Sequence, residues 1–277
     1  MAVLDSALQE AWSPHDYGKL IDTVIAAKSV AFHVATVVQT GNESIRFPMI
    51  TADPAVGWYA ENTQISLTDP TTNELVITPK KTAGLTQISN EAYEDTNPAI
   101  AEQVGTSLAR SIAKKIDAAF FANTTTNAPN GVLSLSGIQT VDPGATYTNL
   151  DAFHEAKSHA LTNGATLTHF VLAQDVALAL SQAKVGTGYN TSLLDTNGVV
   201  DGLTIAGVPV IVSVDVADGN VWGFDASQVY TVQRTGTTVV PDKSAAFAYD
   251  AVQIRATARV SWGFANPAGV VNIVHSA

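Results

Sequence analysis

The sequence predicts an α+β fold in which one long helix lies beside many short strands. Apolar residues recur at every fourth position over residues 98–122, a stretch of about 25 residues that is about twice the length of an average helix. Most other apolar segments are short or alternate with polar residues, which is typical of strands. The chain shows no internal repeat with a period of about 20–50 residues, so a repeat architecture is excluded.

The composition is acidic and poor in charge. The chain has 277 residues, with 14 Lys and Arg against 25 Asp and Glu, and a formal net charge of −11. Only 14% of the residues are charged, whereas about 25% is average for a soluble protein. Surfaces that become buried against other subunits are depleted of charge. This composition therefore predicts a chain whose surface is partly covered by partners.

The same composition excludes several functional classes. The chain has no cysteine, which excludes disulfides, thiolate zinc sites, iron–sulfur clusters and cysteine nucleophiles. The acidic excess argues against a general nucleic-acid-binding protein, because such proteins neutralise phosphates with Lys and Arg. The most apolar run, Val30 to Val38, is shorter than a membrane span of about 18 residues. The N-terminus lacks the charge pattern of a signal peptide, so we expect a soluble, intracellular protein.

The sequence pattern of residues 1–43 predicts an extended or partly helical arm. The pattern of residues 44–82 predicts a long β-hairpin. The apolar spacing over 20–25 is helical, but this segment has too few apolar positions to fold alone. In the hairpin, strands are expected over 44–50 and 57–65, followed by a polar turn around Asp69-Pro70. An isolated two-stranded hairpin is marginally stable in water, so we expect it to lie on a partner.

Residues 83–145 are expected to hold a return strand, the long helix and a turn-rich connector. Asn97 is expected to be the N-cap of the helix and Pro98 its first residue. Glu91, Glu94 and Asp95 precede the helix, where its dipole favours negative charge, so these carboxylates need no catalytic explanation.

Residues 146–240 predict a compact α+β block. Helices are expected over 150–161 and up to residue 183, the second one capped by Asp175, with a buried strand over His169–Ala173 between them. Further strands are expected over 203–213, 221–225 and 229–235.

Residues 241–277 are expected to return as strands that pair with the first half. Arg255 and Arg259 are four residues apart in an alternating strand, so both should lie on one face and meet acidic partners.

No catalytic, metal or cofactor site can be assembled from the spacing of the residues. His154 and His159 lie about 140° apart around a helix, so they cannot share a metal as histidines at i and i+4 do. Gly186-Thr-Gly188 neither follows a strand nor opens a helix, and Asp195–Gly198 is more typical of a tight turn than of a calcium loop. We therefore expect a protein that is not an enzyme.

A series of motifs occurs in a fixed order over about residues 45–277. An aromatic residue and a Glu precede the hairpin tip, two lysines precede the next strand, and a Ser-x-Glu motif and an acidic residue precede the long helix. The motifs are Trp58, Glu61, Asp69-Pro70, Lys80-Lys81, Ser89, Glu91, Asp95, Asp117, Asn130–Leu133, Leu203–Ser213 and Arg255–Pro267. As an ordered set they resemble the tailed-phage major capsid family, which has the Hong Kong 97-like fold.

The resemblance implies an α+β Hong Kong 97-like capsid fold. The implied segments are an N-terminal arm (1–43), an E-loop hairpin (44–82), a P domain with a spine helix at 98–122 (83–145), an A domain (146–240) and P-domain return strands (241–277). The implied function is that of a major capsid protein, which assembles as hexamers and pentamers into an icosahedral shell around packaged double-stranded DNA. The implied location is the virion, after assembly in the host cytoplasm.

The resemblance also implies partners and contacts. The partners are other copies of the chain, a separate scaffold, a portal, decoration proteins, and packaged DNA bound without sequence specificity. The expected intersubunit contacts are Trp12, Trp58, Glu61, Thr68, Asp69, Pro70, Thr71, Arg110, Lys114, Tyr189, Arg255 and Arg259.

Two departures from the family pattern lead to further expectations. Some members begin with a scaffold-like domain, whereas this chain begins at the arm, so a separate scaffold or a processed product is expected. Some members form a Lys–Asn crosslink from an E-loop lysine, but residues 50–79 contain no lysine, so no such crosslink is expected there.

Two alternatives stay open. An encapsulin-type nanocompartment would share the fold and enclose a cargo enzyme, and a β-rich carbohydrate-binding or adhesive module would be a stable monomer.

Overall fold

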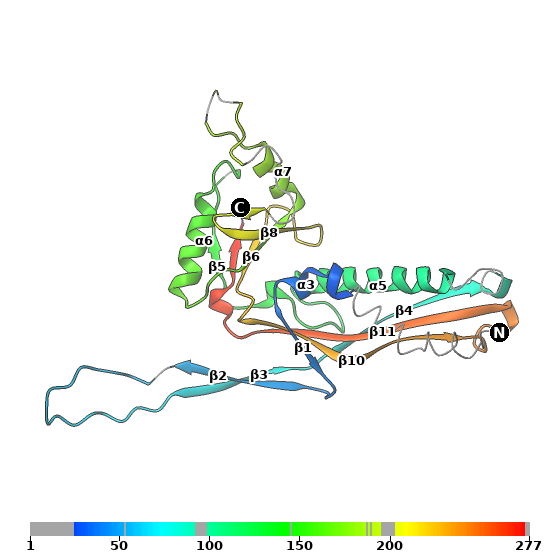
Figure 1. Cartoon of the computed structure of the whole chain (residues 1–277), viewed down its shortest axis with the longest axis horizontal. Coiled ribbons are helices and arrows are strands. Elements are labelled where there is room, and N and C mark those ends of the chain that lie inside the picture. The colour runs from blue at the N-terminus through cyan, green and yellow to red at the C-terminus, as the bar shows by residue number, and fades with distance from the viewer. Residues whose placement is uncertain are drawn as a thin grey trace, which may run out of the picture.

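Two β-sheets and a projecting hairpin form the framework of the molecule (Figure 1). The computed structural model describes residues 25–52, 54–91, 99–144, 146–186, 188, 190–194 and 203–274. No helix among these residues is both long and apolar enough to cross a membrane.

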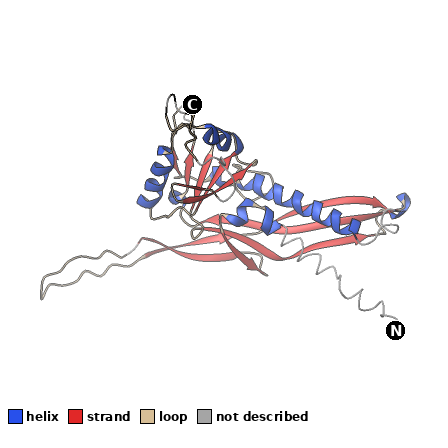
Figure 2. Cartoon of the chain, turned by 45° about the horizontal axis from the view of Figure 1, so that its top comes forward, coloured by secondary structure: helices blue, strands red, loops and turns tan. Residues whose placement is uncertain are grey.

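An elongated four-stranded sheet carries the long helix on one face (Figure 2). In spatial order its strands are β1 (Thr36–Thr40), β10 (Val229–Asp242), β11 (Ala251–Phe264) and β4 (Lys80–Ser89). β1 runs parallel to β10, and the other pairs are antiparallel. Alternate residues of β11 from Val252 to Val260 are buried. The residues between them are half-buried or exposed, so this sheet has one covered and one open face.

The helix α5 spans Ala99–Phe120, within the predicted 98–122. Its buried positions include Ile112, Ile116 and Phe120, which belong to the fourfold apolar pattern of the sequence. It ends before residue 122 because the connector crosses its C-terminal carbonyls. The Gly131 N–H donates to the Asn123 carbonyl at 2.9 Å, and a Cβ at Gly131 would lie 2.1 Å from the Ala122 carbonyl oxygen.

A six-stranded sheet with two helices forms the second part of the body (Figure 1). Its strands, in spatial order, are β5 (Gln139–Val141), β12 (Val271–Ile273), β9 (Val221–Phe224), β6 (His169–Ala173), β8 (Val208–Ser213) and β7 (Thr204–Ile205). The helix α6 (Asp151–Thr162) packs against β5 and β12, and α7 (Gln174–Gln182) packs against β6 and β8. The strand predicted over His169–Ala173 is confirmed residue for residue.

The predicted cap of the second helix is wrong. Because β6 runs directly into α7, the N-cap position falls on Ala173 and has no side-chain hydrogen bond. Asp175 lies in the first turn of the helix and its carboxylate accepts the Gly219 N–H at 2.8 Å. Asp175 therefore fixes a loop to the helix instead of capping it.

Strand pairing divides the chain differently from the expected segment boundaries. β10 begins at Val229, inside the expected block 146–240, yet it pairs with β11 and β1 in the elongated sheet. β5 and β12, from the flanking segments, join the six-stranded sheet instead. The sequence pattern locates strands, but pairing between distant strands depends on contacts that the local pattern does not specify.

One continuous core joins the two sheets at the end of α5. The ring of Phe120 lies 5.7 Å from Phe224 of the six-stranded sheet and 5.3 Å from Trp262 of the elongated sheet, measured between centroids. All three side chains are buried. This aromatic cluster fixes the helix to both sheets.

The described chain also contains short helical elements. They are α3 (Val30–His33), η2 (Val132–Ser134), η3 (Phe247–Tyr249) and η4 (Pro267–Gly269).

Candidate assembly surfaces

The hairpin leaves the body as a two-stranded ribbon. β2 (Ile45–Ala52) pairs antiparallel with β3 (Thr71–Ile77), from Ile45 opposite Ile77 to Ala52 opposite Thr71. The strand expected over 57–65 is wrong: residues 54–70 contain no strand and are all exposed. No sheet or helix of the described residues covers either side of this segment, so it has no packing there that would hold a ladder together.

The base of the hairpin is fixed to the open face of the elongated sheet. Phe47 of β2 stacks on Tyr230 of β10, with centroids 4.5 Å apart. Ile77 is buried against Gly263 of β11, where a Cβ would lie 2.6 Å from the Ile77 Cδ1 atom. The absence of a side chain at Gly263 thus allows β3 to approach the sheet closely.

The outer part of the hairpin exposes large apolar side chains. The exposed fractions are 95% for Val56, 105% for Trp58, 71% for Ile65 and 93% for Leu67. Apolar side chains that gather in one exposed segment are typical of interaction sites. We refer to residues 54–70 as the hairpin tip.

The predicted contact residues of the hairpin lie together in this region. Trp58, Glu61, Thr68, Asp69 and Pro70 belong to the tip, and Thr71 begins β3. The Thr68 hydroxyl donates to the Ala55 carbonyl at 3.2 Å and links the two sides of the tip. Two other predicted contacts, Trp12 and Tyr189, lie outside the described residues.

A buried carboxylate attaches the segment before β1 to helix α5. Asp117 is 4% exposed, and its Oδ1 accepts the Ser29 hydroxyl at 2.6 Å and the Ala31 N–H at 3.1 Å. Its Oδ2 accepts the Val30 N–H at 3.0 Å. Burial raises the pKa of Asp117, because desolvation outweighs the stabilising hydrogen bonds to the carboxylate. The Ala31 carbonyl in turn accepts the Thr231 hydroxyl at 2.8 Å, which ties the segment to β10.

Arg255 and Arg259 lie on the open face of the elongated sheet, as their spacing predicts. Both are exposed, whereas Ala256 and Ala258 between them are buried. The register places Arg259 directly opposite Arg234 of β10 and Lys81 of β4. The sequence alone does not place Arg234 and Lys81 in this group, because only the strand register brings them to Arg259.

Arg110 and Lys114 lie on a third surface, the exposed side of helix α5. Lys114 is close enough to Asp215 to lower the pKa of that carboxyl, although burial outweighs this effect and raises its pKa overall. The structure therefore does not bring these two cations together with the hairpin or with the open face.

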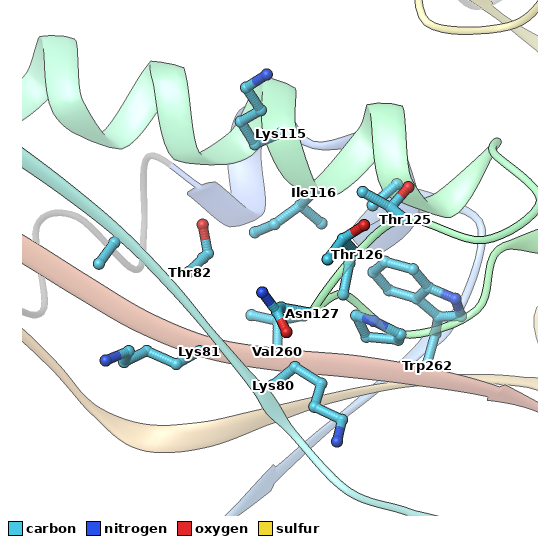
Figure 3. A pocket seen from close by; sticks show the side chains of 14 residues that line it. Lys80, Lys81, Thr82, Lys115, Ile116, Thr125, Thr126, Asn127, Val260 and Trp262 are labelled. Atoms are coloured by element: carbon cyan, nitrogen blue, oxygen red, sulfur yellow. The ribbon is translucent and has the colours of Figure 1, made fainter.

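A pocket of about 350 Å³ lies between α5, β4 and β11 and is closed by the connector after the helix (Figure 3). Ile116, Val260 and Trp262 line its interior, and Asn127 reaches in from the connector. The described lining residues include Lys80, Lys81 and Lys115 but no His, Asp or Glu. This chemistry suits packing or anion contact better than proton transfer.

Histidine geometry offers no metal cluster in the described part of the chain. His159 lies 3.4 Å from Glu155, one helical turn away on α6. No group of three or more His, Asp or Glu side chains among the described residues could hold a metal ion.

The elongated sheet with its long helix, the six-stranded block and the projecting hairpin define a Hong Kong 97-like capsid fold. The chain matches the model of the phage capsid family over residues 14–274, and it belongs to that family. It is thus a structural, non-enzymatic protein of a virion capsid shell.

Solved capsid structures share this fold at low sequence identity. The capsid of an empty GTA particle has a TM-score of 0.76 and 20% identity, with 90% of each chain covered. The capsid of a native GTA particle has a TM-score of 0.74 and 19% identity, with 92% of this chain and 91% of that chain covered. A structure from Mycobacterium phage Adephagia has a TM-score of 0.76 and 14% identity, with 90% of each chain covered. No protein with a curated description matches the sequence.

Proposed function

We propose that the chain is a major capsid protein that assembles as hexamers and pentamers into an icosahedral shell around packaged double-stranded DNA. The observation that carries this proposal is the hairpin tip, which projects from the body with Trp58 and Leu67 almost fully exposed. Such a segment gains stability only when it lies on another subunit. Membership of the phage capsid family supports an assembly of this kind.

The proposal gives each part of the fold a role. The four-stranded sheet with α5 is the P domain, the six-stranded block is the A domain at the centre of the capsomer, and the hairpin is the E-loop that overlies a neighbour. The residues that precede β1 form the arm, which Asp117 fixes to the P domain at Ser29–Ala31. A separate scaffold, a portal and decoration proteins complete the particle, which assembles in the host cytoplasm.

Negative-stain microscopy of the purified chain tests the assembly. Closed shells, or capsomers of five and six subunits, support the proposal, whereas a monodisperse monomer at all concentrations contradicts it. Removing Leu67–Thr72 shortens the tip and the start of β3 without touching the packed base at Ile77 and Gly263. This variant should stay folded by circular dichroism and assemble poorly, and normal shells from it would refute the E-loop role.

The cargo needs its own measurement. Particles purified from the producing host should protect double-stranded DNA from added nuclease. Shells that protect a host enzyme and no DNA would identify an encapsulin-type compartment instead.

A further inference from the structure

The pocket between α5, β4 and β11 is large enough for a small molecule. One helix, two strands and the connector after the helix bound it, and its volume is about 350 Å³ (Figure 3). Ligand pockets in proteins have volumes of about 300–1,000 Å³. Because four parts of the fold bound this pocket, an occupant would contact all of them at once, and it would stabilise the folded subunit by binding to it.

The charged side chains on the two long walls of the pocket are cations. Lys115 of α5 and Lys80 of β4 lie on opposite sides of the pocket (Figure 3). Both are exposed, and neither belongs to an ion pair among the described residues. Each ammonium group stands at the rim on a flexible four-carbon stem, which can turn toward an anion. Asp117 follows Lys115 by two positions, so it lies on another side of the helix, where its carboxylate is bound to the segment before β1.

Neutral hydrogen-bonding groups add to these cations. Thr82, Thr125, Thr126 and Asn127 line the pocket, and their side chains make no hydrogen bond to another described residue. The Ala128 N–H donates to the Thr125 carbonyl at 3.0 Å and closes a turn. In this turn Asn127 has a φ of 63°, in the left-handed region that few residues other than glycine adopt. The turn thus holds the Asn127 amide over the pocket (Figure 3).

The interior wall of the pocket is apolar and rigid. Ile116, Val260 and Trp262 line it, and all three are buried. The Trp262 Nε1–H donates to the Asn130 carbonyl at 2.7 Å, which fixes the position of the ring. An apolar wall with amide and hydroxyl groups beside it and cations at the rim fits an anion that carries a compact apolar body.

We propose that this pocket binds a small organic anion, with its phosphate or carboxylate group between Lys80 and Lys115 and its apolar body against Trp262. The Asn127 amide donates a hydrogen bond to the anionic group. This inference goes beyond the proposed function and does not depend on it, because a single subunit contains the whole pocket.

The first test is calorimetric titration of the full-length, unassembled chain with naphthalene-2-sulfonate, a compact aromatic anion. A probe of this size should bind with a dissociation constant of about 10 μM–1 mM, and it should raise the melting temperature of the subunit as its concentration rises. The neutral analogue 2-naphthalenemethanol should bind several-fold more weakly. Absence of sulfonate binding at millimolar concentrations would overturn the proposal, and so would equal binding of the neutral analogue.

Lys114 and Lys115 provide a matched pair. They are adjacent in α5, but only Lys115 lines the pocket, whereas Lys114 is close to Asp215. The variants Lys115→Gln and Lys80→Gln should each weaken sulfonate binding about two- to fivefold, and Lys114→Gln should bind like the wild type. Equal weakening by Lys114→Gln and Lys115→Gln would mean that the probe responds to surface charge in general, which would overturn the site.

The variant Asn127→Gly tests the amide. Glycine adopts the left-handed conformation freely, so the turn should keep its shape while the hydrogen-bond donor is lost. Sulfonate binding should weaken about fivefold or more, with the far-ultraviolet circular dichroism unchanged.

The hairpin tip is the other surface that would attract an aromatic probe, because Trp58 is exposed there. The variant Trp58→Ala should therefore bind naphthalene-2-sulfonate like the wild type. Loss of binding in Trp58→Ala, with Asn127→Gly and Lys115→Gln unaffected, would assign the probe to the tip and overturn the pocket. None of these measurements requires assembled shells, so their failure leaves the proposed function unchanged.

Discussion

Replacing Asp117 by alanine should destabilise the subunit by about 2–5 kcal/mol, because a buried acceptor of three hydrogen bonds is lost. The Ser29 hydroxyl and the Val30 and Ala31 N–H groups would lose their partner. Each buried donor left unsatisfied costs about 1–3 kcal/mol, and entry of water keeps the total below the simple sum. The measurement is urea unfolding of the unassembled subunit, where the midpoint should fall without a change in slope.

The variant Asp117→Asn adds a test of charge. Its amide keeps one acceptor oxygen but presents an NH2 group to the hydrogen-bond donors around it. We therefore expect the free energy of unfolding to fall by about 1–2 kcal/mol. Burial raises the pKa of Asp117 above its ordinary value of 3.8. Between that value and the raised pKa the folded state holds more protons than the unfolded chain, so this carboxyl contributes more stability as the pH falls. The free energy of unfolding of the wild type should therefore exceed that of Asp117→Asn by a larger margin near pH 4 than near pH 7.

This reasoning is refuted if the difference in the free energy of unfolding between the wild type and Asp117→Asn becomes smaller as the pH falls. A smaller difference would mean that the ionised carboxylate is the form favoured by the fold and that hydrogen bonding outweighs desolvation. Asp215, whose pKa burial also raises, is present in both proteins, and its negative charge adds to the raised pKa of Asp117 in the wild type.

Three other predictions follow from packing and composition. Gly263→Val should destabilise the subunit by about 1–3 kcal/mol in urea unfolding, because the new side chain would displace Ile77 at the hairpin base; unchanged stability would show that the base is loosely packed. Phe120→Ala should cost about 3–5 kcal/mol by the same assay, because the ring joins both sheets, and a smaller loss would mean that the cavity collapses. Denaturing gels of intact particles should show single-chain bands, because residues 50–79 contain no lysine for a crosslink; a covalent ladder of bands would contradict this.

Local patterns in the sequence predicted elements well where one periodicity dominates. The run His169–Ala173 forms a buried strand. A short run of consecutive, mostly apolar residues is typical of a strand that is covered on both faces. The fourfold apolar spacing of α5 likewise located the long helix to within two residues at its C-terminal end. The pattern over 57–65 resembled a strand, but a strand needs a packed neighbour, and the tip has none.

The candidate surfaces were only partly predictable. The residues of the hairpin tip adjoin each other in the sequence, so their grouping could be read directly. Lys81, Arg234 and Arg259 lie side by side on the open face, and only the register of three strands brings them together. The hydrogen bond from Ser29 to Asp117 spans 88 positions. Contacts of this separation follow from the topology, and no local periodicity specifies them.

The topology of the elongated sheet also sets the order of events during synthesis. β1 pairs with residues 230–234, and β4 pairs with β11, which ends at Phe264. The sheet therefore cannot close until nearly the whole chain has left the ribosome. An incomplete chain therefore has its hairpin sequence but no closed four-stranded sheet. The path of the chain thus predicts that truncated products, which lack a closed sheet, stay out of an assembled shell.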